Sequence, residues 1–265
     1  MKMSIQTGLA ALALTFMAAE AAAVQGIITM PNGSKREGDI KWVVRDKVYS
    51  IVEKGRPIEM QLKPEEIADL QIPRPRELDA AIESIRQGNA AAAVSSLEKI
   101  AADYLMLQWD KPATRYLAEA HVQAGNADKA IAVCEKVIAA NPEAAYLGEM
   151  APAYWQALIK RERLSKVEDL ISKAIKAGDR LASANALIAR GDLVQASGDT
   201  ADIAKKALRD GYLRVITLYK SERAAQPEAL FKAAKCFEKL GLPQRADQLR
   251  TTLKGEFGSS EWAKK

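Results

Sequence analysis

The 265-residue sequence contains a single histidine, His121, and only two cysteines, Cys134 and Cys236. Two cysteines are too few for a scaffold that is built from disulfides. A single histidine leaves acid–base catalysis without a recognisable pair of groups. The sequence also lacks a glycine-rich phosphate loop and any Cys/His spacing that is typical of a metal site. We therefore expect a protein that is not an enzyme, with no catalytic residue, metal, cofactor or small-molecule substrate.

Long apolar runs are missing after residue 23, so no later segment is predicted to span a bilayer. The one long apolar run, at 5–19, follows Lys2 and precedes the small residues Ala21 and Ala23, which is typical of a secretory signal peptide over 1–23. A retained anchor helix is the alternative, but the run is short and rich in alanine. No cysteine lies near the predicted cleavage site, so we do not expect a bacterial lipoprotein. We expect export to the periplasm or the extracellular space, with at most peripheral membrane association.

Charge of one sign is also not in strong excess. The formal net charge is +5, and lysine and arginine are interspersed with aspartate and glutamate. The densest basic run, at 160–163, falls at a predicted turn between helices and is interpreted as a solvated loop. We therefore expect no nucleic-acid partner.

Residues 24–73 carry the β signals of the sequence. Apolar residues alternate with polar ones at 40–44 and 58–62, and the run at 48–52 is rich in β-branched residues. Asn-Gly at 32–33 is a strong hairpin signal. With a single helical turn at 63–66, the segment predicts a small all-β domain of about five strands, closed or nearly closed into a barrel.

The turn motifs of this segment resemble those of the SH3-like and Sm-like barrels of bacterial envelope proteins. The matching features are Asn32-Gly33, Gly38-Asp39-Ile40, Gly55 and Pro64-Glu65-Glu66-Ile67. In such a barrel, Trp42 and Tyr49 are candidates for an aromatic shelf that binds a ligand such as a proline-rich peptide. The alternative is that both side chains simply fill a small core.

Helix-forming residues dominate residues 74–265, after a boundary that two prolines mark at 73–75. The glycines Gly88, Gly125, Gly198 and Gly241 punctuate this part, and the first two lie 37 residues apart. A period in the mid-thirties is typical of paired-helix repeats. The segment therefore predicts about five helical hairpins, of which the fourth has an elongated second helix over 201–225.

The clearest repeat runs over 111–144. Leu117-Ala118, His121, Gly125, Ala130 and Pro142 occupy the signature positions in a frame that resembles the tetratricopeptide repeat (TPR) superfamily. The resemblance implies a mostly α fold, a TPR-like right-handed α-solenoid preceded by the small β domain. Together with the signal peptide, the segment 207–262 resembles exported bacterial cell-envelope TPR proteins. That resemblance implies a scaffold or adaptor whose partners are other envelope proteins.

The same resemblance implies a concave groove that binds a peptide or a helix of a partner. The groove positions of the family fall on Arg115, Glu119, Val122, Gln123, Gln156, Lys160, Asp192, Gln195, Phe231, Lys235, Glu238 and Lys239. A cell-wall or carbohydrate-binding protein is the alternative. It would use the small β-barrel as its binding domain and the repeats as a spacer.

The two cysteines fall in the second and fifth predicted hairpins. Hairpins of a repeat stack touch only their neighbours, and a disulfide requires Cα atoms within about 7 Å. We therefore predict that Cys134 and Cys236 do not pair, even in an oxidising compartment.

Overall fold

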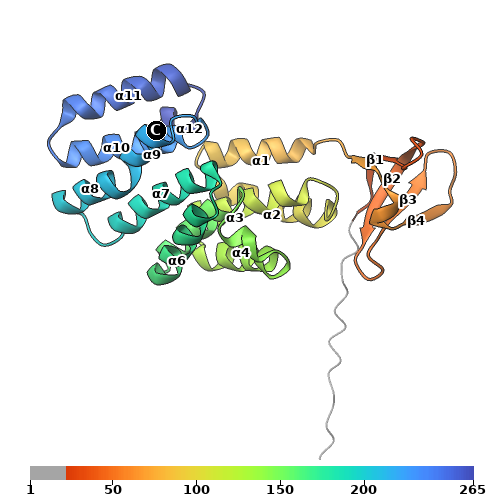
Figure 1. Ribbon diagram of the computed structural model, residues 1–265. Coiled ribbons are helices and arrows are strands. Elements are labelled where there is room, and N and C mark those ends of the chain that lie inside the picture. The colour runs from red at the N-terminus through yellow and green to blue at the C-terminus, as the bar shows by residue number, and fades with distance from the viewer. Residues whose placement is uncertain (1–21) are drawn as a thin grey trace, which may run out of the picture.

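The computed structural model describes residues 22–265 of the chain (Figure 1). The predicted signal peptide over 1–23 lies outside the described residues except for its last two positions. In the described part, a β-sheet comes first and a long array of helices follows it.

The sheet is antiparallel and has five strands in the order β4-β3-β2-β1-β5. The strands are β1 (Val24–Thr29), β2 (Lys35–Val43), β3 (Val48–Glu53), β4 (Glu59–Leu62) and β5 (Asp69–Gln71). A 3₁₀ turn, η1 (Pro64–Glu66), leads from β4 back to β5, which pairs with β1 at the far edge. Ile28, Ile40 and Ile51 have no exposed surface, and they anchor the apolar face that the alternating pattern predicts.

The helical part begins four residues after β5. Its elements are α1 (Arg76–Arg86), α2 (Ala90–Asp103), α3 (Asp110–Gln123), α4 (Ala127–Ala140), η2 (Pro142–Ala145), α5 (Ala151–Lys160), α6 (Leu164–Lys176), α7 (Arg180–Gln195), α8 (Ala201–Ala207), the π-helical η3 (Leu208–Tyr212), α9 (Leu213–Leu218), α10 (Gln226–Lys239), α11 (Pro243–Phe257) and α12 (Glu261–Lys264). Each helix packs on the next one along the chain, and α1, α3, α5 and α7 also pack on one another in succession. This is the order of contacts that a stack of helical pairs requires.

The pair α3–α4 corresponds to the clearest repeat of the sequence. Ala118 and Ala130 have no exposed surface, so their small side chains allow the two helices to lie close together. Leu117, His121 and Cys134 are buried at the neighbouring signature positions. The burial predicted from the repeat frame is therefore confirmed at these residues.

The fourth pair differs from its prediction. The helix expected over 201–225 ends at Leu218, and its middle turns form the π-helical segment η3. Gln226 ends the helix, because its buried side-chain amide donates hydrogen bonds to the carbonyl oxygens of Val215 (3.1 Å) and Tyr219 (2.8 Å). The prediction took the following loop for helix, since 219–225 carries helix-forming residues but no proline or glycine.

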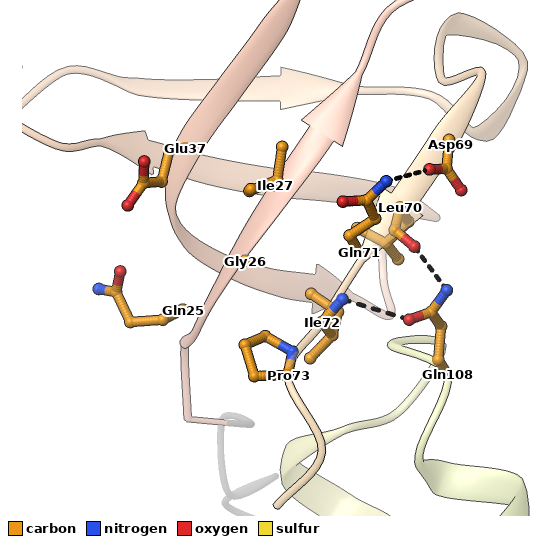
Figure 2. Close-up of a pocket in the computed structure, with 10 residues that line it drawn as sticks. All are labelled: Gln25, Gly26, Ile27, Glu37, Asp69, Leu70, Gln71, Ile72, Pro73 and Gln108. Carbon is orange, nitrogen blue, oxygen red and sulfur yellow. Dashed lines mark hydrogen bonds between the residues drawn. The ribbon is translucent and has the colours of Figure 1, made fainter.

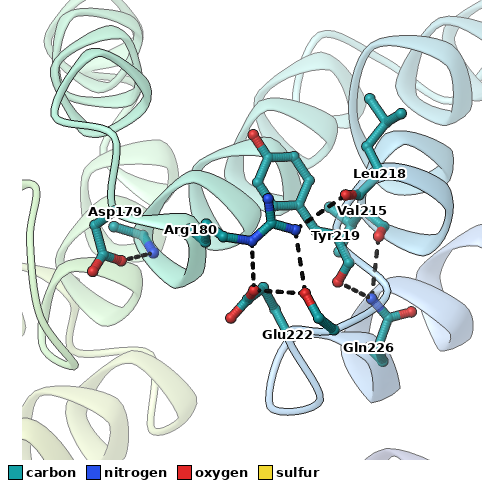
Figure 3. A network of polar contacts seen from close by, with 9 residues as sticks. Asp179, Arg180, Val215, Leu218, Tyr219, Glu222 and Gln226 are labelled. Atoms are coloured by element: carbon teal, nitrogen blue, oxygen red, sulfur yellow. Dashed lines mark hydrogen bonds and ion pairs between the residues drawn. The ribbon is translucent and has the colours of Figure 1, made fainter.

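Arg180 fixes that loop to the start of α7 (Figure 3). Its guanidinium pairs with Glu222 (3.0 Å), donates to the Ser221 hydroxyl (3.2 Å) and lies over the ring of Tyr219. Asp179 caps the same helix by accepting the Ala182 N–H at 2.7 Å. The network therefore has a structural role, because it holds the start of the fourth helical pair against the loop that leads into the fifth.

The sheet does not merely precede the helices, because the loop between α2 and α3 completes its core. Leu107 is fully buried among the apolar side chains of the sheet. Trp109 donates its indole N–H to the Ile72 carbonyl at 2.9 Å, and Tyr49 donates its hydroxyl to the Met106 carbonyl at 3.2 Å. Gln108 accepts the Ile72 N–H at 3.2 Å and donates to the Leu70 carbonyl. Sequence reasoning missed this docking.

Both cysteines are free and buried, in separate apolar clusters. The prediction that they do not pair is confirmed. Burial raises the pKa of the Cys134 thiol to about 12, so it is a poor nucleophile in the folded chain. Among residues 22–265, no helix is both long and apolar enough to cross a membrane.

His121 gives the fold a predictable dependence on pH. Burial lowers the pKa of its imidazole; the charge of Glu98 partly opposes this shift, and the charge of Lys129 adds to it. The Nδ1 atom has no hydrogen-bond partner among the described residues. The unfolded chain therefore binds a proton near pH 6.5 that the folded chain rejects. We expect the free energy of unfolding to fall as pH drops below about 6.5, by at most about 1.4 kcal/mol per pH unit from this group.

Urea unfolding at pH 7.5 and pH 5.5 measures this effect, with His121→Phe as the reference. The parent chain should lose more stability over that interval than the variant does. An equal loss in both proteins would show that His121 does not titrate on unfolding.

Candidate functional site: the inner face of α3, α7 and α10

The residues predicted to line a groove come from α3, α5, α7 and α10. On α3, Arg115 pairs with Glu149 at 3.2 Å and its guanidinium lies over the Tyr116 ring. Glu119 accepts a hydrogen bond from the exposed Gln123 at 3.3 Å. The placement of Val122 in the groove is wrong, because only 3% of its surface is exposed and it packs in the apolar core. The family frame gave the position of Val122 on the helix, but in this structure that position packs against other buried apolar residues.

On α5, Gln156 is half-buried and Lys160 is exposed. Neither makes a hydrogen bond or ion pair among the described residues. On α7, the half-buried Gln195 donates to the Cys236 sulfur at 2.9 Å. These side chains belong to the predicted groove but do not converge with one another.

Asp192 on α7 is the centre of a nearly buried charge network. It accepts hydrogen bonds from the Tyr212 hydroxyl (2.8 Å) and from the Lys232 ammonium (2.8 and 2.6 Å). Lys232 also pairs with Glu228 at 2.5 Å, and the side chains of all three charged residues are at most 20% exposed. Burial alone would lower the pKa of Lys232, but Glu228 and Asp192 outweigh it and raise the pKa. Asp192 therefore joins α7, η3 and α10, and its oxygens are occupied.

On α10, Phe231 and Lys235 lie on one face, with the Lys235 ammonium 4.7 Å from the centre of the Phe231 ring. Glu238 pairs with Arg250 of α11, and Lys239 pairs with Asp199 in the loop before α8. Lys235 makes no ion pair among the described residues. Of the predicted set on α10, Lys235 is thus the exposed member without an ion pair among the described residues, and the half-buried Phe231 lies beside it.

The last helix, α12, adds residues that sequence reasoning missed. Trp262 packs against Phe231 with the ring centres 5.3 Å apart, and Lys232 lies over the same indole. Ser260 starts the helix by accepting the Trp262 N–H at 3.2 Å. A serine followed by an acidic residue and a tryptophan, directly after the break at Gly258, was the available signal.

Glu119 links α3 to this end of the chain. Burial raises the pKa of its carboxyl, and the nearby Glu261 and Glu228 raise it further, whereas Arg115 and Lys265 oppose them. The charges on α3, α10 and α12 are therefore close enough to act on one another. Together, Arg115, Glu119, Phe231, Lys232 and Lys235 form what we call the inner face.

The raised pKa of Glu119 predicts that its charge destabilises the fold at neutral pH. A carboxyl group whose pKa is raised in the folded state stabilises the fold while it is protonated in both states, below the unfolded pKa near 4.3. This stabilisation is lost as the pH rises through the pKa of the folded state. Glu119→Gln should therefore raise the melting temperature at pH 7, and the gain should vanish below about pH 4.3. Glu98→Gln, at an exposed carboxylate of α2, is the matched control and should change little at either pH. A loss of stability in Glu119→Gln at pH 7 would contradict the burial argument.

The proposed aromatic shelf of the β domain has a different environment. Trp42 and Tyr49 are in edge contact with ring centres 4.8 Å apart, but Tyr49 is only 8% exposed and its hydroxyl bonds the helical part. This arrangement favours the alternative, in which the rings fill the core and the interface.

A shallow depression of about 540 Å³ lies on the other side of that interface (Figure 2). Its walls come from β1, β2, β5 and the loop before α3, and they include the polar side chains of Gln25, Glu37, Asp69, Gln71 and Gln108. The amide of Gln71 donates to Asp69 at 2.8 Å, and Gln108 is held by backbone groups. No aromatic ring lines the depression, and its apolar lining comes from Ile27, Leu70, Ile72 and Pro73.

Comparison with known proteins supports the repeat assignment. Residues 84–151 match the family described as tetratricopeptide repeat, which covers α2 to the start of α5 and supports membership of the TPR superfamily. TPR domains typically bind other proteins, so the match indicates a non-catalytic interaction module. No curated protein and no solved structure matches the chain. Within residues 22–265, no group of three or more His, Cys, Asp or Glu side chains is placed to hold a metal ion.

Proposed function

We propose that the protein is an exported scaffold of the bacterial cell envelope that binds a peptide or a helix of a partner protein on the inner face. The single observation that carries the proposal is the pair formed by the half-buried Phe231 and the exposed Lys235, which lies on the first helix of a TPR-like pair. Apolar and charged groups side by side suit a peptide better than a purely apolar ligand.

The architecture supports this reading. Successive first helices pack on one another, which extends one surface along α1, α3, α5 and α7. A right-handed TPR-like solenoid would make that surface concave. The antiparallel order of five strands and the 3₁₀ turn before β5 support an SH3-like barrel for the small β domain, and its docking through Trp109 suggests a rigid extension of the scaffold.

Export is proposed from the N-terminal sequence alone. The charged start, the apolar run at 5–19 and the Ala21-x-Ala23 pattern favour cleavage before Val24. The intact mass of the protein recovered from the periplasm should correspond to a chain that begins within a few residues of Val24. Recovery of the uncleaved chain from carbonate-washed membranes would contradict export as a cleaved protein.

Affinity capture from envelope extract tests the binding surface. Arg115→Ala/Lys235→Ala removes two cations of the inner face, and Lys136→Ala/Lys254→Ala removes two exposed cations of second helices, α4 and α11. We expect recovery of a specific partner, identified by mass spectrometry, to fall at least about tenfold for the first variant, since charge-assisted contacts contribute about 1.5–3 kcal/mol each. Equal recovery with both variants would reject the inner face as the binding surface.

A cell-wall or carbohydrate ligand of the β domain is the second candidate, and the polar depression beside Gln71 is the observation that favours it. Binding of the full chain to isolated peptidoglycan, abolished by Gln71→Ala but not by Arg115→Ala/Lys235→Ala, would support this candidate over the first.

A further inference from the structure

The C-terminal segment 259–265 lies on the inner face. The helix α12 lies beside α10 (Figure 1). The Trp262 ring packs against Phe231, and the Lys232 ammonium lies 5.6 Å from the centre of the indole ring. Within the segment, the Lys265 ammonium lies 3.7 Å from the same ring centre. Phe231 and Lys235 occupy groove positions of the TPR frame. Residues 259–265 therefore cover part of the surface that is proposed to bind a partner.

The segment is held by side chains only. Its hydrogen bonds are local, from Ser260 to Phe257, from Ala263 to Ser260 and from Trp262 to the Ser260 hydroxyl. No residue of α12 is fully buried. An element with few buried contacts and no hydrogen bond to its neighbours opens far more easily than the core of a domain.

The charges of this segment also act beyond the last helical pair. Glu261 and Lys265 act on Glu119, which lies on α3, three helical pairs away along the chain. The helices that α12 packs against are α10 and α11.

We propose that residues 259–265 are a built-in ligand of the inner face, displaced by a partner peptide that presents an aromatic residue to Phe231 and Lys232. The inference rests on the proposed function and adds the chemistry of the ligand and a means of regulation. The segment itself shows that chemistry, because the indole of Trp262 packs on the Phe231 ring beside Lys232.

A tethered ligand competes at high effective concentration, which is of millimolar order for a short flexible link. The link here is Gly258-Ser259. If the free peptide binds the open inner face with a Kd of about 100 µM, the tether should weaken the apparent affinity of the full chain about tenfold.

The probe is a fluorescein-labelled peptide of residues 258–265, followed by fluorescence anisotropy. It is titrated against the full chain, against Trp262→Ala in the full chain, and against a chain that ends at Gly258. We expect about tenfold tighter binding to both altered chains than to the parent. Lys264→Ala, an exposed neighbour on α12, is the matched control and should bind as the parent does. Phe231→Ala in the shortened chain, and the Trp262→Ala form of the peptide, should abolish binding.

Equal affinity for all chains, or no binding to the altered chains, would overturn the inference and leave α12 as a cap of the last helical pair. A large drop in the melting temperature of Trp262→Ala would do the same, because a displaceable segment contributes little to global stability. These outcomes are distinct from failure of the proposed function: loss of partner capture in Arg115→Ala/Lys235→Ala can hold whether or not the peptide binds.

Discussion

Gly211→Ala should destabilise the protein by about 3 kcal/mol, because the π-helical η3 crosses α7 with no room for a methyl group. A Cβ at Gly211 would lie 2.7 Å from the backbone N and Cα of Gly191 and 2.8 Å from the Leu187 carbonyl oxygen. Backbone atoms cannot rotate away, so the two helices must separate. Overpacking of this kind typically costs about 1–3 kcal/mol and occasionally more.

Urea unfolding at pH 7 measures the loss, and Gly255→Ala is the matched control. Gly255 lies in α11, and a Cβ there meets nothing within 4 Å. Alanine should stabilise an open helical position by about 0.5–1 kcal/mol relative to glycine. The two substitutions are chemically identical, so opposite signs would isolate the effect of the crossing. A neutral result for Gly211→Ala would show that α7 and η3 are not in close contact.

Lys232→Met should destabilise the protein by about 3 kcal/mol, since it leaves Asp192 and Glu228 without their shared cation. Their side chains are 18% and 20% exposed, so water compensates the lost pair poorly. Removing one partner from a buried ion pair typically costs about 3–5 kcal/mol. Because the pKa of Lys232 is raised in the fold, its contribution is complete at neutral pH and is lost only above about pH 10.4.

A second variant separates charge from packing. Lys232→Met combined with Asp192→Asn and Glu228→Gln should recover most of the loss, because no uncompensated charge is then buried. Lys235→Met, at the exposed lysine one turn along α10, should stay within about 0.5 kcal/mol of the parent. If the triple variant is as unstable as Lys232→Met alone, the network contributes through its shape and not through its charge.

The contrast between these residues shows how far sequence reasoning reaches. Leu117, Ala118 and Ala130 could be predicted because their burial follows from a short local period. The burial of Val122 could not be predicted, since the exposure of that face of α3 depends on which helices pack beside it. The same holds for Asp192, which the repeat frame placed in the groove. In the structure Asp192 has a structural role, because it pairs with Lys232, 40 residues further along the chain.

The sequence pattern did not indicate contacts between segments that lie far apart in the chain. The docking of Leu107 into the sheet depends on residues at positive φ, Met106 and Gln108, neither of which is a glycine or an asparagine. The second helix of the fourth pair is shorter than predicted, because the side chain of Gln226 hydrogen-bonds the carbonyl groups at its end. Glutamine is an ordinary helix former, so its position gave no sign of this role. In each case a side chain from elsewhere in the chain decides the outcome.

Site-specific photo-crosslinking in living cells tests the central claim, which is that the inner face binds a partner protein. A photoreactive residue at position 235 or 115 probes the inner face, and one at position 254 or 136 probes the second helices. We predict adducts with the same protein from positions 235 and 115 and none from positions 254 and 136. Adducts confined to positions 254 and 136 would contradict the account, as would adducts of equal yield from all four positions.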